Sequence, residues 1–217
     1  FLRSLIENDI PLNEGFLKDI DIIIPKSSML NPIYPAPVVA GNVETSQNLI
    51  DLLNTTIKVQ ASCYGTMSNI AFGNKYFGYY ETICGGEGAS KGNNGNDAVH
   101  CHMTNTSITD PEILEWFYPV RLREFSIRKL SGGKGKWSGG NGVIRKIEFL
   151  KNLDLSILSN RRIIVPPGIN NAGSGKKGIN LLITSDKQKL KLKYSSQIKV
   201  KKGDILIIQT PGGGAYN

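Results

Sequence analysis

Both histidines of the chain lie in one short segment, 97–106, which holds the densest group of reactive side chains in the sequence. His100 and His102 are two residues apart, so on a β-strand they would share one face with Thr104, while Cys101 would face the opposite side. Near neutral pH a histidine can act as a general base, as a proton shuttle or as a metal ligand. Alternatively, both imidazoles only form hydrogen bonds within a buried polar layer, and the residue types do not decide between the two interpretations.

A carboxylate and an arginine could join the histidines. Glu81 stands in a predicted strand, shortly before Gly85 and Gly86. A role in general acid–base catalysis requires a buried carboxylate with a shifted pKa, whereas a solvated or salt-bridged glutamate is the commoner outcome. A hydrolytic metal would need a third ligand, which Asp97 or Glu81 could supply only if the fold brings them close. Arg121 could bind a carboxylate or phosphate through two parallel hydrogen bonds, although an arginine beside a strand is usually structural.

The cysteines indicate a reduced environment. Three of them cannot all pair with one another, and Cys63, Cys84 and Cys101 show no CxxC spacing. Their number and spacing favour free thiols and a cytoplasmic protein. A zinc site of Cys101 with His100 and His102 is disfavoured, because neighbouring residues of a strand point to opposite sides. A nucleophilic cysteine needs a depressed pKa, and apolar, glycine-rich surroundings favour an inert thiol.

Four glycine-rich segments raise the question of a phosphate-binding loop. None of them has the GxxxxGK[ST] pattern or a GxGxxG between a strand and a helix. The favoured interpretation is that their glycines permit positive φ in the hairpins of a β domain. We therefore expect no nucleotide site within this chain. The segments are Gly85–Gly88, Ser131–Gly135, Ser138–Gly142 and Gly212–Gly214.

The formal net charge of +8 is the next feature that could indicate a partner. Much of the excess comes from lysines at every second position from Lys187 to Lys193, which predicts a strand with one solvated face. No aromatic residues or base-recognition motif accompany these lysines, so we expect no nucleic-acid partner. The sequence has no run of about 18 apolar residues, so we expect no membrane-spanning helix.

Apolar periodicity and turn residues predict an α+β chain that is mainly β. The clearest helix is predicted over 46–58, with Asn42 or Thr45 as its cap. A second, short helix should begin near Pro111 and end near Trp116. The apolar stripe of the first helix consists of Leu49, Ile50, Leu52, Leu53 and Ile57.

Two portions are predicted, with a boundary near residue 122. Residues 1–121 should form a mixed α/β portion with short strands at 21–24 and 77–83. Residues 122–217 should form an antiparallel β-sandwich or partial barrel, because short apolar runs alternate there with glycine turns. Strands of this portion are expected at 122–129, 142–150, 153–159, 179–184, 190–194 and 204–210.

Seven short motifs lie in one order along nearly the whole chain. Any one of them would be weak, but the ordered set is highly specific. The motifs are Val39–Gln47, Tyr80–Gly86, His100–Thr106, Ser131–Gly133, Gly139–Gly142, Ser159–Arg162 and Thr210–Tyr216. Together they resemble the hydantoinase B/oxoprolinase family.

The resemblance implies a two-component enzyme. An A component with an actin-like ATPase fold would bind ATP and phosphorylate a carbonyl or enol oxygen of the substrate. The B component would then carry the activated species to ring opening by water, with a small cyclic amide such as 5-oxoproline or a hydantoin as substrate. The family's expected divalent-metal segment lies in the N-terminal half of the B component, and nothing in this sequence matches it. We therefore expect a fragment of a longer B component that is inactive alone.

The resemblance also assigns roles to residues. His100, His102 and Glu81 are expected to be catalytic, while the metal ligands are expected mostly outside this chain. Two alternatives remain, namely a fragment of an acetone carboxylase-type large subunit and a non-catalytic remnant that only contacts the A component. Contacts to the substrate are expected from Asn42, Thr104, Asn105, Thr106 and Arg121.

Overall fold

Two compact units, Phe1–Gly41 and Asn42–Asn217, make up the chain in a computed structural model that describes residues 1–6, 11, 13–39 and 41–217. The first unit contains two short 3-10 helices, η1 (Leu2–Leu5) and η2 (Glu14–Leu17). Asn13 caps η2, because its Oδ1 accepts a hydrogen bond of 2.9 Å from the Gly15 N–H. The strand predicted at 21–24 is wrong, since this stretch has no regular structure.

The second unit holds nearly all the regular structure, and most of it is β-strand. A short π-helix, η3 (Gly41–Thr45), leads directly into the first α-helix. Among the described residues, no helix combines the length and apolar character needed to cross a membrane. The α-helices are α1 (Ser46–Thr56) and α2 (Pro111–Phe117), and the strands are β1 (Ser68–Asn74), β2 (Phe77–Thr82), β3 (Val120–Ile127), β4 (Val143–Phe149), β5 (Leu153–Ser159), β6 (Ile179–Ile183), β7 (Lys189–Leu192), β8 (Ser195–Val200) and β9 (Ile205–Gln209).

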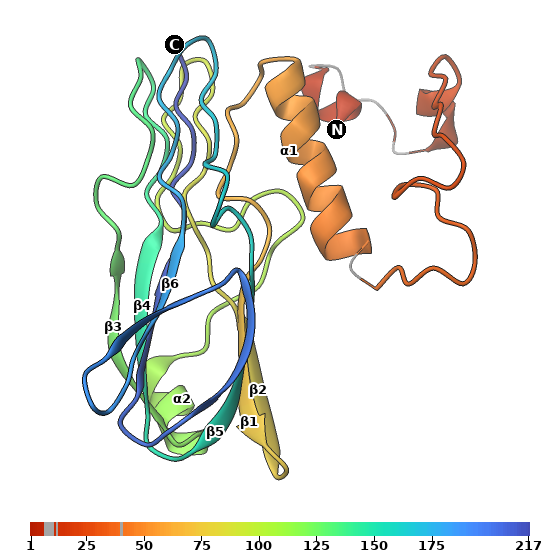
Figure 1. The fold of residues 1–217 in the computed structure, drawn as a ribbon. Coiled ribbons are helices and arrows are strands. Elements are labelled where there is room, and N and C mark those ends of the chain that lie inside the picture. The colour runs from red at the N-terminus through yellow and green to blue at the C-terminus, as the bar shows by residue number, and fades with distance from the viewer. Residues whose placement is uncertain (7–10, 12, 40) are drawn as a thin grey trace. The chain divides into compact units, whose positions relative to one another are not determined.

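The strands form two sheets in which every neighbouring pair is antiparallel (Figure 1). The first sheet has the order β2-β1-β5-β8 and the second has the order β3-β4-β9-β6-β7. One core lies between them, with Ile70 and Leu155 from the first sheet packed in the same cluster as Ile147 and Leu206 from the second. The prediction of a mainly β, antiparallel fold is confirmed. The first sheet takes strands from both sides of residue 122, and the boundary there stays a prediction.

Period-two alternation explains which strand faces are buried. In β4 the buried side chains are Val143, Arg145, Ile147 and Phe149, each separated by a half-buried residue. At the outer edge of the second sheet β7 carries exposed lysines, as the alternation of lysines predicts. Charged side chains on an edge strand discourage pairing with another chain.

Helix α2 begins as its sequence predicts. Asp110 is the N-cap, and its Oδ1 accepts hydrogen bonds from the N–H groups of Glu112 (2.9 Å) and Ile113 (3.3 Å), while Pro111 occupies the first turn. Leu114 is the buried residue of this helix and belongs to the main core. The cap therefore stabilises the start of the helix that contributes Leu114 to the core.

Removal of this cap gives a first testable expectation. Asp110→Ala should lower the free energy of unfolding by about 1 kcal/mol, because two N–H groups of the first turn lose their acceptor. Urea denaturation measures the change. Asp154→Ala, on the exposed face of β5, is the control and should change stability by less than about 0.5 kcal/mol. Equal effects of the two substitutions would contradict the capping role.

The glycine-rich loops pack against one another. A Cβ at Gly86 would lie 2.0 Å from the carbonyl oxygen of Gly140, and a Cβ at Gly213 would lie 1.9 Å from that of Glu87. The three N–H groups are also used, because Gly86 donates to Pro211 O, Gly140 to Glu87 O and Gly213 to Gly140 O. These glycines are thus required for close backbone approach. The prediction that they supply positive φ is wrong for the four segments described here, since none contains a positive-φ glycine.

Candidate functional site

Helix α1 presents polar side chains to the interior. Gln47, Asp51 and Asn54 are its buried residues, at the spacing of four and three that places side chains on one helical face. Leu52 and Ile57, from the predicted apolar stripe, are exposed. The helix itself is confirmed, but the face that packs inward is the polar one. Thr45 occupies the cap position without a side-chain capping bond among the described residues.

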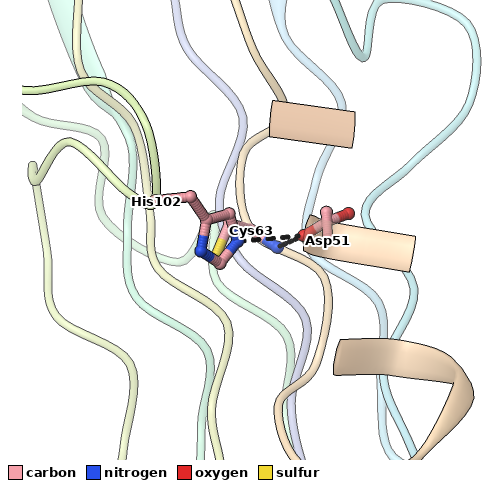
Figure 2. A group of neighbouring side chains, drawn as sticks. All are labelled: Asp51, Cys63 and His102. Carbon is pink, nitrogen blue, oxygen red and sulfur yellow. Dashed lines mark hydrogen bonds and ion pairs between the residues drawn. The ribbon is translucent and has the colours of Figure 1, made fainter. Parts of the chain in front are cut away.

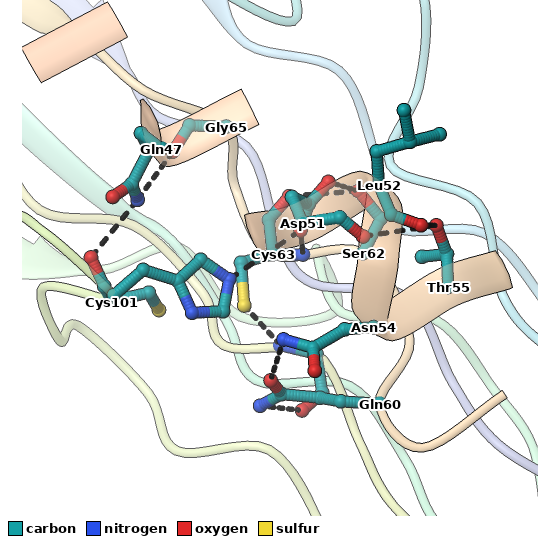
Figure 3. A network of polar contacts seen from close by, with 12 residues as sticks. Gln47, Asp51, Leu52, Asn54, Thr55, Gln60, Ser62, Cys63, Gly65 and Cys101 are labelled. Atoms are coloured by element: carbon teal, nitrogen blue, oxygen red, sulfur yellow. Dashed lines mark hydrogen bonds and ion pairs between the residues drawn. The ribbon is translucent and has the colours of Figure 1, made fainter. Parts of the chain in front are cut away.

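Gln47 connects helix α1 to the histidine segment, residues 97–106, by hydrogen bonds (Figure 3). Its Nε2 donates to the Cys101 carbonyl oxygen at 2.9 Å, and its Oε1 accepts from the Met103 N–H at 2.8 Å. Between these two contacts the backbone turns at His102, whose φ is +54°. The predicted strand through this segment is therefore wrong. Only Val99 forms a bridge there, with Gly85, and the turn directs His102 toward α1.

Asp51 is the centre of the polar cluster. Its Oδ1 accepts the Cys63 N–H at 2.8 Å, and its Oδ2 accepts Ser62 Oγ–H at 2.6 Å and an Arg161 N–H at 2.8 Å. Burial alone would raise the pKa of the Asp51 carboxyl, but His102, Ser62, the Cys63 N–H and Arg161 together lower it. The carboxylate is therefore held ionised in a nearly closed environment.

His102 and Cys63 complete the cluster (Figure 2). His102 Nε2 lies 3.7 Å from Asp51 Oδ1, an ion-pair distance that is too long for a hydrogen bond. Burial opposes a charged ring, yet Asp51 and Cys63 raise the pKa of His102 to about 10. The Cys101 thiol, followed by His102, lowers the pKa of Cys63 to about 6 against the effect of burial. The Gly88 N–H also donates to Cys63 Sγ at 3.3 Å, so the surroundings stabilise a thiolate.

The chemical capacity of this cluster follows from its donor atoms and its burial. The ligand atoms of Asp51, Cys63 and His102 lie within 4.8 Å of one another, so they could hold one divalent metal ion. A thiolate beside an imidazolium is also the arrangement of a nucleophilic cysteine. However, Cys63 is only 1% exposed, so a substrate does not reach its sulfur in this conformation.

A cavity of about 610 Å³ borders the cluster. Arg161 lines it and also donates to Asp51, so one side chain joins the cavity wall to the buried carboxylate. Arg162, in the same wall, donates to neutral groups and has no ion-pair partner among the described residues. The other lining residues are Glu44, Asn48, Leu158, Ser159, Asn160, Ile163, Ile164 and Tyr194.

His100 has partners different from those of His102. Its Nδ1 is 3.1 Å from Tyr64 Oη and its Nε2 is 3.3 Å from Thr106 Oγ1, so both ring nitrogens are oriented. The side chain is half-buried, and burial lowers its pKa, which keeps the ring neutral near pH 7. The two histidines do not share one face of a strand as predicted.

Glu81 lies in the core between the sheets. Arg145 Nε and Nη2 donate to its two carboxylate oxygens at 2.6 and 2.9 Å, and the Tyr79 hydroxyl donates to it at 2.7 Å. Among the described residues none of its polar partners is a histidine, so the structure does not bring Glu81 together with His100 and His102. The ion pair joins β2 of the first sheet to β4 of the second.

The residues predicted to contact substrate are spread over three elements. Asn42 lies in η3, where its carbonyl oxygen accepts the Ser46 hydroxyl. Thr104 and Asn105 follow the His102 turn, and the Thr104 N–H donates to Cys101 O. Arg121 is exposed on β3, the edge strand of the second sheet. Their contact with a substrate stays a prediction.

Sequence reasoning missed Asp51, Ser62, Cys63 and Arg161 as members of one site. The available signal was the polar stripe Gln47, Asp51 and Asn54, which has helical spacing just as the apolar stripe does. Nothing in the sequence indicated that this stripe would meet a cysteine and a histidine from two later segments.

Comparison with known proteins identifies the family of the chain. The sequence model described as hydantoinase B/oxoprolinase matches residues 1–217. The chain belongs to the hydantoinase B/oxoprolinase family. Two relatives are 5-oxoprolinase 1 of Arabidopsis thaliana, 49% identical over 215 residues, and 5-oxoprolinase of Dictyostelium discoideum, 45% identical over 215 residues. Each alignment covers 99% of this chain but only 17% of the relative.

A solved structure has the same fold as this family member. The ATP-dependent caprolactamase of Pseudomonas jessenii superposes with a TM-score of 0.81 at 23% identity. The superposition covers 100% of this chain and 41% of the caprolactamase chain. At this identity the likeness supports the architecture of the two antiparallel sheets and no more.

Proposed function

We propose that this chain is part of an ATP-dependent cyclic amidohydrolase that opens 5-oxoproline or hydantoin-type rings. The observation that carries the proposal is its similarity to 5-oxoprolinases over 99% of its length. Because the chain spans only 17% of these relatives, the activity would belong to a larger protein or assembly. The chain alone would be inactive.

The chemistry explains why such an enzyme needs several parts. A lactam carbonyl is stabilised by resonance and is a poor electrophile. We therefore propose that an A-type ATPase component, fused or separate, binds ATP and uses it to activate the substrate carbonyl. Attack by water then requires a base and preorganised donors for the developing charge. We propose His100 as the base, because Tyr64 orients its half-buried ring through Nδ1, while the attacking water would replace the longer contact of 3.3 Å between Nε2 and Thr106. Thr104 and Asn105, beside it, would supply donors.

The cavity beside the Asp51 cluster is the proposed place for the substrate's charged end. A small-molecule site is typically concave and has a few converging polar groups. Arg162 brings to the cavity a positive charge that forms no ion pair with a carboxylate of the described residues. The carboxylate of 5-oxoproline would satisfy this guanidinium through charge-assisted hydrogen bonds.

The remaining parts of the proposal concern the complete protein. A divalent metal would be held mostly by residues outside this chain. Glu81 would have a structural role in place of the predicted catalytic one, because Arg145 and Tyr79 occupy its oxygens. The three free cysteines of the chain fit a reducing compartment, and we propose that the protein is located in the cytoplasm.

The test is an assay of the complete protein with its ATPase component. We expect glutamate release that requires both ATP and 5-oxoproline. The absence of turnover on 5-oxoproline and on hydantoins would contradict the proposal. Bicarbonate-dependent consumption of a ketone would instead support an acetone carboxylase-type enzyme.

A further inference from the structure

We propose that Asp51, Cys63 and His102 form a binding site for one zinc ion. The three side chains come from α1, from the segment before β1 and from the turn at residues 102–103. Their ligand atoms lie within 4.8 Å of one another. This site is separate from the metal that the proposed activity requires elsewhere in the complete protein.

The distance between two of the donors fits an ion placed between them. Asp51 Oδ1 and His102 Nε2 are 3.7 Å apart. Two ligands bound tetrahedrally to zinc at about 2.0–2.1 Å lie about 3.3–3.4 Å from each other. Closure by a few tenths of an ångström would therefore bring both atoms to zinc distance.

An unsatisfied atom points to the same conclusion. His102 Nε2 is buried and has no hydrogen-bond partner among the described residues. Buried polar atoms in proteins almost always have a partner, and those without one call for an unseen ion or water. A metal bound to Nε2 would satisfy this atom directly.

The type of donor selects the ion. Thiolate and imidazole are soft or borderline ligands that suit zinc, whereas calcium and magnesium require oxygen ligands. Ser62 and Arg161 bind Oδ2 of the Asp51 carboxylate, and the Cys63 N–H binds Oδ1, which faces His102 and keeps a second lone pair for a metal. Such outer hydrogen bonds are typical of metal-ligating carboxylates. Three protein ligands leave a fourth position for water or another ligand.

The proposed site differs from the zinc site that was considered, and disfavoured, from the sequence. That site used Cys101 together with both histidines. In the structure His100 is engaged by Tyr64 and Thr106, and the metal-competent partners of His102 are Asp51 and Cys63. The turn at His102, with its φ of +54°, directs this ring toward α1.

The experiment compares metal content and spectra in the complete, untagged protein. The wild-type protein should hold one more equivalent of zinc than Cys63→Ser. Replacement of this zinc by cobalt should produce a thiolate-to-cobalt charge-transfer band that Cys63→Ser lacks. Loss of an outer hydrogen-bond partner of a metal ligand typically weakens metal binding by about 10- to 100-fold. Asp51→Asn and His102→Asn each remove a ligand and should therefore weaken zinc binding by more than this.

Cys84→Ser is the matched control, because Cys84 is also a free, buried cysteine but belongs to the main core. It should keep both the extra equivalent and the charge-transfer band. Equal zinc content in the wild type and in Cys63→Ser, or a band that persists in Cys63→Ser, would overturn the site. Because the band is recorded on the wild type, its absence there overturns the site even if the variants do not fold. The readouts do not depend on turnover, so they are independent of the proposed activity.

Discussion

Arg145→Met should destabilise the protein by about 3–5 kcal/mol, because it leaves the Glu81 carboxylate buried without its charged partner. The side chains of Arg145 and Glu81 are only 1% and 3% exposed, so water cannot replace the lost contact. The bidentate geometry, with contacts of 2.6 and 2.9 Å, makes this ion pair a strong polar link between the two sheets. Denaturant unfolding followed by circular dichroism measures the loss.

Two further variants make the result specific. Arg123→Met removes a partly exposed ion pair with Glu148 and should cost less than about 1 kcal/mol. The double variant Arg145→Met with Glu81→Leu should recover most of the lost stability, because no buried charge then remains unpaired. If the single substitutions at Arg145 and Arg123 cost the same, the ion pair does not have the role assigned to it.

His100→Ala in the complete enzyme should lower kcat for cyclic amide hydrolysis by about 10²- to 10⁴-fold, the usual contribution of a general base. Tyr64→Phe removes the contact between Oη and Nδ1 and should lower kcat about fivefold to tenfold, with KM little changed. Steady-state kinetics with saturating ATP separates the two parameters.

Tyr80→Phe is the control for these kinetics, because Tyr80 is 61% exposed on β2. It should leave kcat unchanged. Thermal unfolding of all variants shows whether the fold is intact. A folded His100→Ala enzyme with wild-type turnover would exclude the base assignment and would support the alternative of a non-catalytic assembly part.

Both α-helices and most of the strands could be predicted from the sequence because they depend on local patterns, whereas β1 and β8 were not predicted. Alternation along β4 and β5, the lysines of β7 and the Asp110-Pro111 start of α2 are all short-range signals. Hydrophobic periodicity also identified α1. It could not show which face packs inward, because the polar face finds partners in segments that only the tertiary structure brings close.

The site was less accessible to sequence reasoning for the same reason. Glu81 has the right residue type for acid–base chemistry, but its partner Arg145 lies 64 residues later and gives it a structural environment. The sequence identified His102 as a reactive residue. It could not predict where the ring points, because this depends on a left-handed backbone conformation at His102 that a regular strand does not contain. Cys63 and Asp51 became relevant only once α1 packed against the segment that follows it.

The interlocked glycine loops determine when this polypeptide can fold as it leaves the ribosome. Backbone contacts join Gly86 to Pro211, Ala89 and Ser62 to Gly214, and Trp137 to Tyr216. The nascent chain therefore cannot complete the loops around Ser62–Ala89 until residues 211–216 have been synthesised and released from the exit tunnel. Backbone contacts between residues this distant in sequence require the closure of long loops, which has an entropic cost, and they therefore form slowly. During that interval the half-built sheets would expose apolar strands, and exposed strands of this kind are prone to aggregate.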